Sequence, residues 1–218
     1  MFPPRKEMFH YLENFHKNIE RRFKYGVSFF DCENAIYEVC QFFEIDPPAF
    51  ISDLTEHPQG QTMFVDSNKY SYADDIICYS MEELKSLGIK TKDAFSLVMT
   101  HECAHRLLQN THMPGLNDGS WEEELCCDFF MGVRAGLGDI DPKAMQAVRE
   151  GLSQSEGSTT HPTGKLRYDI ISYGYTWVGG FDLIHHRKRS LSEYIRLFDE
   201  WRIKHLDEIR EAQRPFFS

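Results

Sequence analysis

The sequence predicts a single α+β domain that is mostly helical and carries a small sheet. Three observations favour this class. Long segments repeat apolar residues at helical spacing, two short runs near the middle have strand-like composition, and the chain has 218 residues, the size of one ordinary domain. We expect N-terminal helices within 1–45, a central core over 60–175 and a C-terminal helix over 190–213, all within one domain over 1–218.

Two helices are predicted in the N-terminal part of the chain. Residues 6–24 repeat apolar side chains every three or four positions, which is typical of an amphipathic helix. Asp31 is a good N-cap for a second helix that reaches Phe43. Pro47 and the proline after it end this helix, because proline cannot continue the hydrogen-bond ladder.

An extended region follows, and two helices come after it. Residues 61–65 and 75–79 are predicted to be short strands, joined by a segment that opens with a polar turn. A short helix over 81–87 is expected to end at Gly88, and a longer helix is expected to cover 91–108.

The C-terminal half is predicted to be helical except at its loops. Residues 109–119 contain proline and glycine and are expected to form a loop. Helical patterns then cover three segments: 120–135, 141–152 and 163–173. The last helix, 190–213, carries an apolar stripe that we expect in the core. Residues 177–180 include two glycines and are predicted to form a turn before this last helix.

Charge and hydropathy exclude two classes of partner. The chain has 34 acidic and 24 basic residues, a formal net charge of −10, so it repels the phosphate backbone of nucleic acids. No uncharged apolar run approaches the roughly 18 residues of a membrane helix, and the charged start does not resemble a signal peptide. We therefore expect a cytoplasmic protein without a membrane span. Its six cysteines lack CxxC spacing and are expected to be buried thiols, and nothing in the sequence predicts an oligomeric state.

The segment His101-Glu102-Cys103-Ala104-His105 fits the pattern HExxH. On a helix, His101 and His105 stand one turn apart on the same face, so both imidazoles can converge on one zinc ion. Glu102 lies about 100° around the helix, where it can reach a metal-bound water rather than join the ligand pair. The pattern also occurs by chance, in helices whose histidines are solvated or lie in the core.

A catalytic zinc site needs a third protein ligand and one open position. Glu124 is the best candidate, since Asp128 lies four residues later on the same helical face and can accept the outer N–H of a ligating histidine. Glu123 is a rival ligand but has no acidic partner four residues on. The extended pattern HExxHxxGxxH fails, because its glycine and last histidine are missing. The alternative is an acidic, solvated helix start.

A third segment, HPTGKLR, begins at His161 and includes Arg167 as its last residue. A histidine and a cation beside the metal of a hydrolytic site can hold the developing oxyanion or bind the substrate backbone. The alternative is a capping loop with a surface histidine and a structural salt bridge from Arg167 to an acidic residue.

The segments HECAH, EELCCD and HPTGKLR, in this order, resemble the gluzincin zinc metallopeptidases, and most closely the HtpX and CAAX-prenyl-protease family. The resemblance covers roughly 72–175 and implies a zincin-like metallopeptidase core with an active-site helix and flanking helices. It implies zinc-dependent hydrolysis of a protein or peptide substrate, and we expect an endopeptidase. It implies His101, His105 and Glu124 as the zinc ligands and Glu102 as the general base. It also implies that His161 and Arg167 lie at the active site.

Two other interpretations remain open. An ImmA/IrrE-like peptidase that cuts a regulator would also be small and carry HExxH with a downstream acid, but the HPxxxxR segment favours the first family. A non-catalytic interaction module stabilised by zinc is the second. A purely structural zinc site is normally closed by four protein ligands, and Glu102 would have no role in it.

Overall fold

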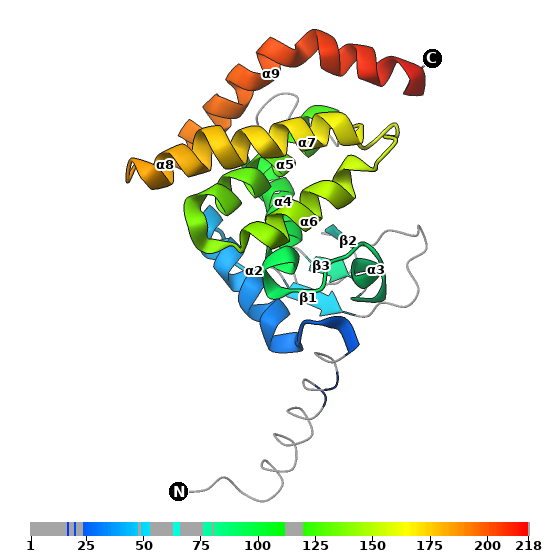
Figure 1. Cartoon of the computed structure of the whole chain (residues 1–218), viewed down its shortest axis with the longest axis vertical. Helices are drawn as coiled ribbons and strands as arrows, with labels where there is room; N and C mark the ends of the chain where they lie inside the picture. The colour runs from blue at the N-terminus through cyan, green and yellow to red at the C-terminus, as the bar shows by residue number, and fades with distance from the viewer. Residues whose placement is uncertain are drawn as a thin grey trace, which may run out of the picture.

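The computed structural model describes residues 17, 20, 24–47, 49–52, 63–65, 76–79, 81–111 and 120–217. Helices α4 (Lys92–Thr111) and α5 (Trp121–Arg134) run through the middle of the molecule (Figure 1). Helix α2 (Phe29–Phe43) packs against α4, and α7 (Gly164–Tyr173) packs against α5. The long helix α9 (Leu191–Gln213) lies at the end of the molecule away from the strands (Figure 1).

Helix α2 begins with a reciprocal capping box. Its N-cap is Ser28, whose hydroxyl accepts a hydrogen bond from Asp31 N (3.2 Å), while Asp31 Oδ2 accepts one from Ser28 N (2.8 Å). The prediction that Asp31 is the N-cap is therefore wrong, because Asp31 is the third residue of the helix. The helix ends at Phe43, as predicted. The helix predicted over 6–24 lies almost entirely outside the described residues.

Three short strands pair in the order β1-β3-β2 (Figure 1). Strand β1 (Ala49–Ser52) is parallel to β3 (Ile76–Tyr79), and β2 (Met63–Val65) is antiparallel to β3. The register pairs Ala49 with Ile76 and Met63 with Tyr79. Strands β2 and β3 lie within the segments predicted at 61–65 and 75–79, whereas β1 has no counterpart among the predicted strands.

The predicted α+β class is nevertheless wrong, because the described chain is a helical domain. The strands are only three or four residues long, whereas α4 alone has 20 residues. Where burial is described, the core consists of side chains from the helices and their connections, together with Tyr79 of β3. Local strand-like composition was recognised, but it does not build a sheet layer.

The remaining helices agree with the predicted segments. Helix α3 (Met81–Ser86) ends before Gly88, whose φ of 86° is readily adopted by glycine. Helices α4, α5, α6 (Pro142–Ser153), α7 and α9 match their predicted segments to within a few residues. Side-chain caps start three of them: Ser120 for α5, Asp141 for α6 and Ser190 for α9.

The turn predicted at 177–180 is wrong. Helix α7 continues through a π-helical segment, η2 (Gly174–Gly179), into α8 (Gly180–Ile184). A Cβ atom on Gly179 would lie 2.2 Å from the carbonyl oxygen of Val133 in α5. The glycine therefore permits close approach of two helices and does not change the direction of the chain.

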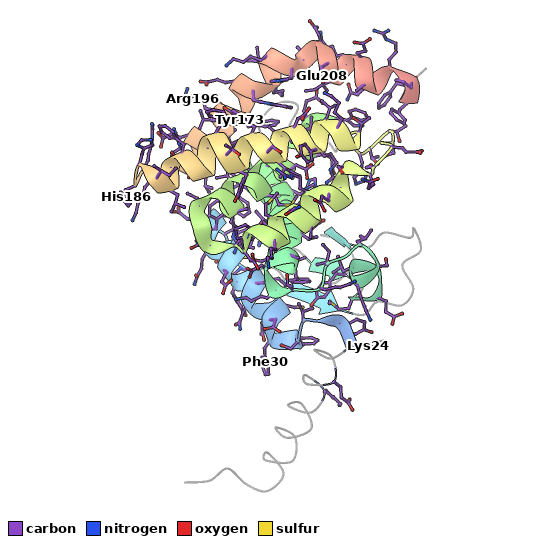
Figure 2. All side chains as sticks on the ribbon, viewed as in Figure 1. Lys24, Phe30, Tyr173, His186, Arg196 and Glu208 are labelled. Atoms are coloured by element: carbon purple, nitrogen blue, oxygen red, sulfur yellow. The ribbon has the colours of Figure 1, made fainter. Side chains whose placement is uncertain are left out.

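The core lies around α5, in which every residue except Glu122 is buried. Glu208 lies on α9 (Figure 2) and forms an ion pair with Lys165 of α7. Five cysteines are buried thiols, as predicted: Cys32, Cys40, Cys103, Cys126 and Cys127. Among the helices that the structure describes, none combines the length and the apolar composition that a membrane span requires.

Candidate metal centre

Helices α4 and α5 bring together the three side chains that the motifs predicted as metal ligands. The Nε2 atoms of His101 and His105 are 3.2 Å apart. Glu124 faces both rings: its Oε2 lies 3.3 Å from His101 Nε2 and its Oε1 lies 3.3 Å from His105 Nε2. One potential ligand atom of each residue lies within 4.8 Å of the others. The predicted cluster is therefore present in the fold.

Helix geometry explains how the three side chains meet. The two histidines are one turn apart on α4, so their rings lie on one face. Helix α5 begins at the N-cap Ser120, whose carbonyl oxygen accepts a hydrogen bond from Glu124 N (3.1 Å). Packing of α5 on α4 then turns the first helical turn of α5 toward the histidine face.

A chain of hydrogen bonds supports His101 from behind. His101 Nδ1 lies 3.0 Å from Asp128 Oδ1, as the spacing of Glu124 and Asp128 predicted. A carboxylate only accepts, so Nδ1 carries the hydrogen and Nε2 of the neutral ring offers its lone pair to the cluster. Arg167 donates to the same carboxylate from Nε (2.7 Å) and from one terminal nitrogen (2.9 Å).

Arg167 contacts Asp128 and not the open side of the cluster. The sequence analysis had considered Arg167 as a group that contacts substrate. Its side chain is buried against the fully buried Asp128. This is the structural salt bridge that was the alternative interpretation of the HPTGKLR segment. The guanidinium orients Asp128, and through it His101, and it is not exposed to hold an oxyanion.

His105 has a carboxylate support of its own, which the sequence analysis did not assign. Glu123 Oε1 lies 2.7 Å from His105 Nδ1, and Glu123 is buried. The sequence analysis considered Glu123 only as a rival ligand. The acidic residue beside Glu124 was the available signal, but spacing within α5 does not reveal contact with a ring on α4.

The carboxylates control the charge of the rings in the absence of an ion. Burial lowers the pKa of His101, but its contacts with the carboxylates of Asp128 and Glu124 outweigh it and raise the pKa to about 9. Burial also lowers the pKa of His105, yet contacts with Cys127, Glu123 and Glu124 hold it well above its usual range. Positive charge at the two rings is therefore strongly favoured.

Two of the carboxylates that face the rings, Glu124 and Asp128, stay ionised. Burial raises the pKa of Glu124, but its contacts with His101 and His105 outweigh this and hold the pKa well below its usual range. Burial likewise opposes ionisation of Asp128, and Arg167 together with His101 lowers its pKa. The centre thus holds fixed negative charge around a position that a cation can fill.

His161 borders the cluster on its exposed side. Its Nε2 lies 3.9 Å from Glu124 Oε2, and 52% of the side chain is exposed. Thr160 Oγ1 lies 2.8 Å from the other ring nitrogen, Nδ1. Trp121 Nε1 donates to Ser158 O (2.9 Å), which ties this loop to the first residue of α5. The loop is therefore positioned by the same helix that supplies Glu124.

Glu102 lies next to His101 on α4, with a partly exposed side chain. Burial opposes the charge of Arg167, but the negative charges of Asp128, Glu124 and Glu102 raise the pKa of Arg167 above its ordinary value. Glu102 therefore lies in the electrostatic neighbourhood of the cluster without being one of its three donor residues.

The cluster fits a divalent ion. Glu124 Oε2 is buried and has no hydrogen-bond partner among the described residues, which is costly unless a cation compensates it. The two Nε2 atoms are 3.2 Å apart, close to the about 3.3–3.6 Å between ligands of a tetrahedral ion at about 2.0–2.2 Å. Each of them lies 3.3 Å from a different oxygen of Glu124, and one donor atom from each residue lies within 4.8 Å of the others. With neutral imidazoles, three buried carboxylates (Glu123, Glu124, Asp128) and one guanidinium (Arg167) leave two negative charges, which one divalent cation balances.

Comparison with known proteins identifies no relative of this chain. No family model matches it, and neither a curated protein nor a solved structure does. The resemblance to gluzincin peptidases therefore stays a prediction from the motifs. The geometry of the metal centre is the structural observation that bears on function.

Proposed function

We propose that this protein is a zinc-dependent metallopeptidase whose centre is formed by His101, His105 and Glu124. The observation that carries the proposal is the convergence of two Nε2 atoms and one carboxylate, each 3.2–3.3 Å from its neighbours, with His161 on the exposed side. Three protein ligands of this type, with room for a further one, are typical of catalytic rather than structural zinc sites.

The side chains around the ion have separate tasks in this proposal. Zinc held by His101, His105 and Glu124 would supply an activated water molecule and polarise the scissile carbonyl. The Glu102 carboxylate accepts the proton that the attacking water loses and returns it to the leaving amine. His161 Nε2 is exposed beside Glu124 and can stabilise the carbonyl oxygen as negative charge develops on it. Arg167 and Asp128 keep the His101 ring in position.

A non-catalytic zinc module is the second candidate. The favouring observation is that His101 and Glu124 are both buried and join the two central helices, so a bound ion would also stabilise the fold. A partly exposed glutamate at position 102 has no task in such a module, which is why we favour the peptidase.

A peptide library tests the peptidase and separates the two candidates. We expect the zinc-loaded protein to cleave library peptides, as identified by mass spectrometry. Glu102→Gln should keep its zinc and lose at least about 100-fold in turnover, because the proton acceptor is gone. If the variant cleaves as fast as the parent, Glu102 is not the base. If neither cleaves, while chelation lowers the melting temperature strongly, the zinc module is supported instead.

A further inference from the structure

We infer that Glu123 is a positioning residue of the metal centre, which fixes the His105 ring for coordination and strengthens zinc binding. This inference concerns the same centre as the proposed function and rests on its metal-binding part. It does not depend on peptide hydrolysis.

Direct contact supports the inference. Glu123 Oε1 lies 2.7 Å from His105 Nδ1, a short distance for a hydrogen bond to a charged acceptor. Glu123 is 3% exposed, so water competes little for this contact. A carboxylate only accepts, and therefore Nδ1 of His105 carries the donated hydrogen. The lone pair of the neutral ring is then at Nε2, the atom that faces Glu124.

The same geometry argues against Glu123 as the metal ligand. Nδ1 and Nε2 lie on different sides of an imidazole ring, and Glu123 occupies the Nδ1 side while Glu124 occupies the Nε2 side. Glu123 is also not among the residues whose potential ligand atoms gather at the centre. Two consecutive glutamates thus contact the two nitrogens of one ring.

The start of α5 makes this arrangement rigid. Ser120 Oγ accepts a hydrogen bond from Glu123 N (3.2 Å), and the Ser120 carbonyl oxygen accepts one from Glu124 N (3.1 Å). Successive helical residues point about 100° apart. The cap therefore fixes the directions of both side chains before an ion binds.

Glu123 and Asp128 give the two histidines equivalent supports. Asp128 accepts from His101 Nδ1 and Glu123 accepts from His105 Nδ1, and both acids come from α5. A carboxylate behind a ligating imidazole orients the ring and raises its basicity, and loss of such a partner typically costs about 10–100-fold in metal affinity.

Zinc affinities of glutamate variants test the inference. Competition with a chromophoric chelator should give a dissociation constant about 10–100-fold higher for Glu123→Ala than for the parent. Glu123→Gln keeps an acceptor oxygen but loses the charge, so it should show a smaller loss. Glu122→Ala is the matched control, because Glu122 shares the first turn of α5 but is partly exposed and outside the centre. It should bind zinc within about twofold of the parent.

Two affinities would overturn the inference. If Glu123→Ala binds zinc as tightly as the parent, the contact does not support the ring. If Glu123→Ala loses zinc as completely as Glu124→Ala does, Glu123 is a ligand and not a positioning residue. If the parent itself binds no zinc, the proposed function and the claim that Glu123 strengthens zinc binding both fail. The ring proton described next then tests only whether Glu123 fixes the His105 ring.

NMR of the ring protons gives a readout that general destabilisation would not move. The Nδ1 proton of His105 should resonate far downfield in the parent and lose that shift in Glu123→Gln, while the Nδ1 proton of His101, held by Asp128, keeps its own. This comparison also decides the case if Glu123→Ala does not fold. An unchanged His105 resonance in Glu123→Gln would overturn the inference.

Discussion

Two parts of α5 are held in the core for different chemical reasons. The charged half, residues 121–128, carries three buried acidic residues, Glu123, Glu124 and Asp128, whose charges face two histidines and one arginine. The C-terminal half carries Gly132, where a Cβ atom would lie 2.2 Å from the carbonyl oxygen of Ile171. One half is thus held by carboxylates paired with histidines and an arginine. The other, the glycine half (residues 129–134), is held by close backbone contact and by hydrogen bonds from the buried Arg134 to Ser96 and Thr100.

This difference shows how packing supports the centre. The glycine half determines how closely α7 approaches α5, and α7 carries Arg167. The guanidinium can reach both oxygens of Asp128 only when the helices stay that close. Burial alone therefore does not mark function in this helix, whereas buried charge that converges on one point does.

The charged half should give the largest effect on stability. Asp128→Asn is expected to lower the free energy of unfolding by about 3–5 kcal/mol, because it leaves the buried Arg167 without its carboxylate. The double variant Asp128→Asn/Arg167→Met should lose less than the sum of the two single losses, because no uncompensated charge remains. Urea denaturation of the metal-free proteins measures this cycle, and additive losses would contradict the account of the charged half.

The glycine half should give the next largest effect. Gly132→Ala is expected to cost about 3 kcal/mol, the upper end for overpacking, since a backbone carbonyl cannot rotate away from the added methyl group. Gly151→Ala is the matched control in α6, where the nearest atom to an added Cβ is 3.6 Å away. It should be neutral or stabilise by about 0.5–1 kcal/mol. Equal effects at both positions would mean that the close approach of α5 and α7 does not matter.

The pH dependence of the metal-free protein should be smaller and should arise in the charged half. The pKa of His101 is raised from 6.5 to about 9, so protonated His101 stabilises the fold. This contribution is complete below about pH 6.5 and is lost as the pH rises to about 9, a decrease on the order of 1–3 kcal/mol. Denaturation of chelator-treated protein between these pH values measures it. Stability that is flat or rises over this range would contradict the pKa shift.

Local spacing explains which features the sequence predicted correctly. His101 and His105 are one turn apart, and Glu124 and Asp128 are four residues apart, so each pair shares a helix face whatever the tertiary structure. The helices that carry them also begin near recognisable caps such as Ser120. The cluster could therefore be predicted from motifs within single helices.

Tertiary contacts explain what the sequence did not predict. Glu123 reaches His105 only because α5 packs on α4, and Gly179 serves helix contact instead of a turn because α5 lies beside it. The position of Arg167 behind Asp128, and not beside a substrate, follows from the same packing. Two short strands were predicted where β2 and β3 lie, but local composition did not show how small a part of the fold they form, so the helical class was missed.

Anomalous diffraction at the zinc absorption edge, from crystals grown with zinc, tests the central claim most directly. The account predicts one anomalous peak bonded to the Nε2 atoms of His101 and His105 and to a Glu124 carboxylate oxygen, and no such peak at this position in Glu124→Ala crystals. A peak elsewhere, or a zinc ion coordinated without Glu124, would contradict it.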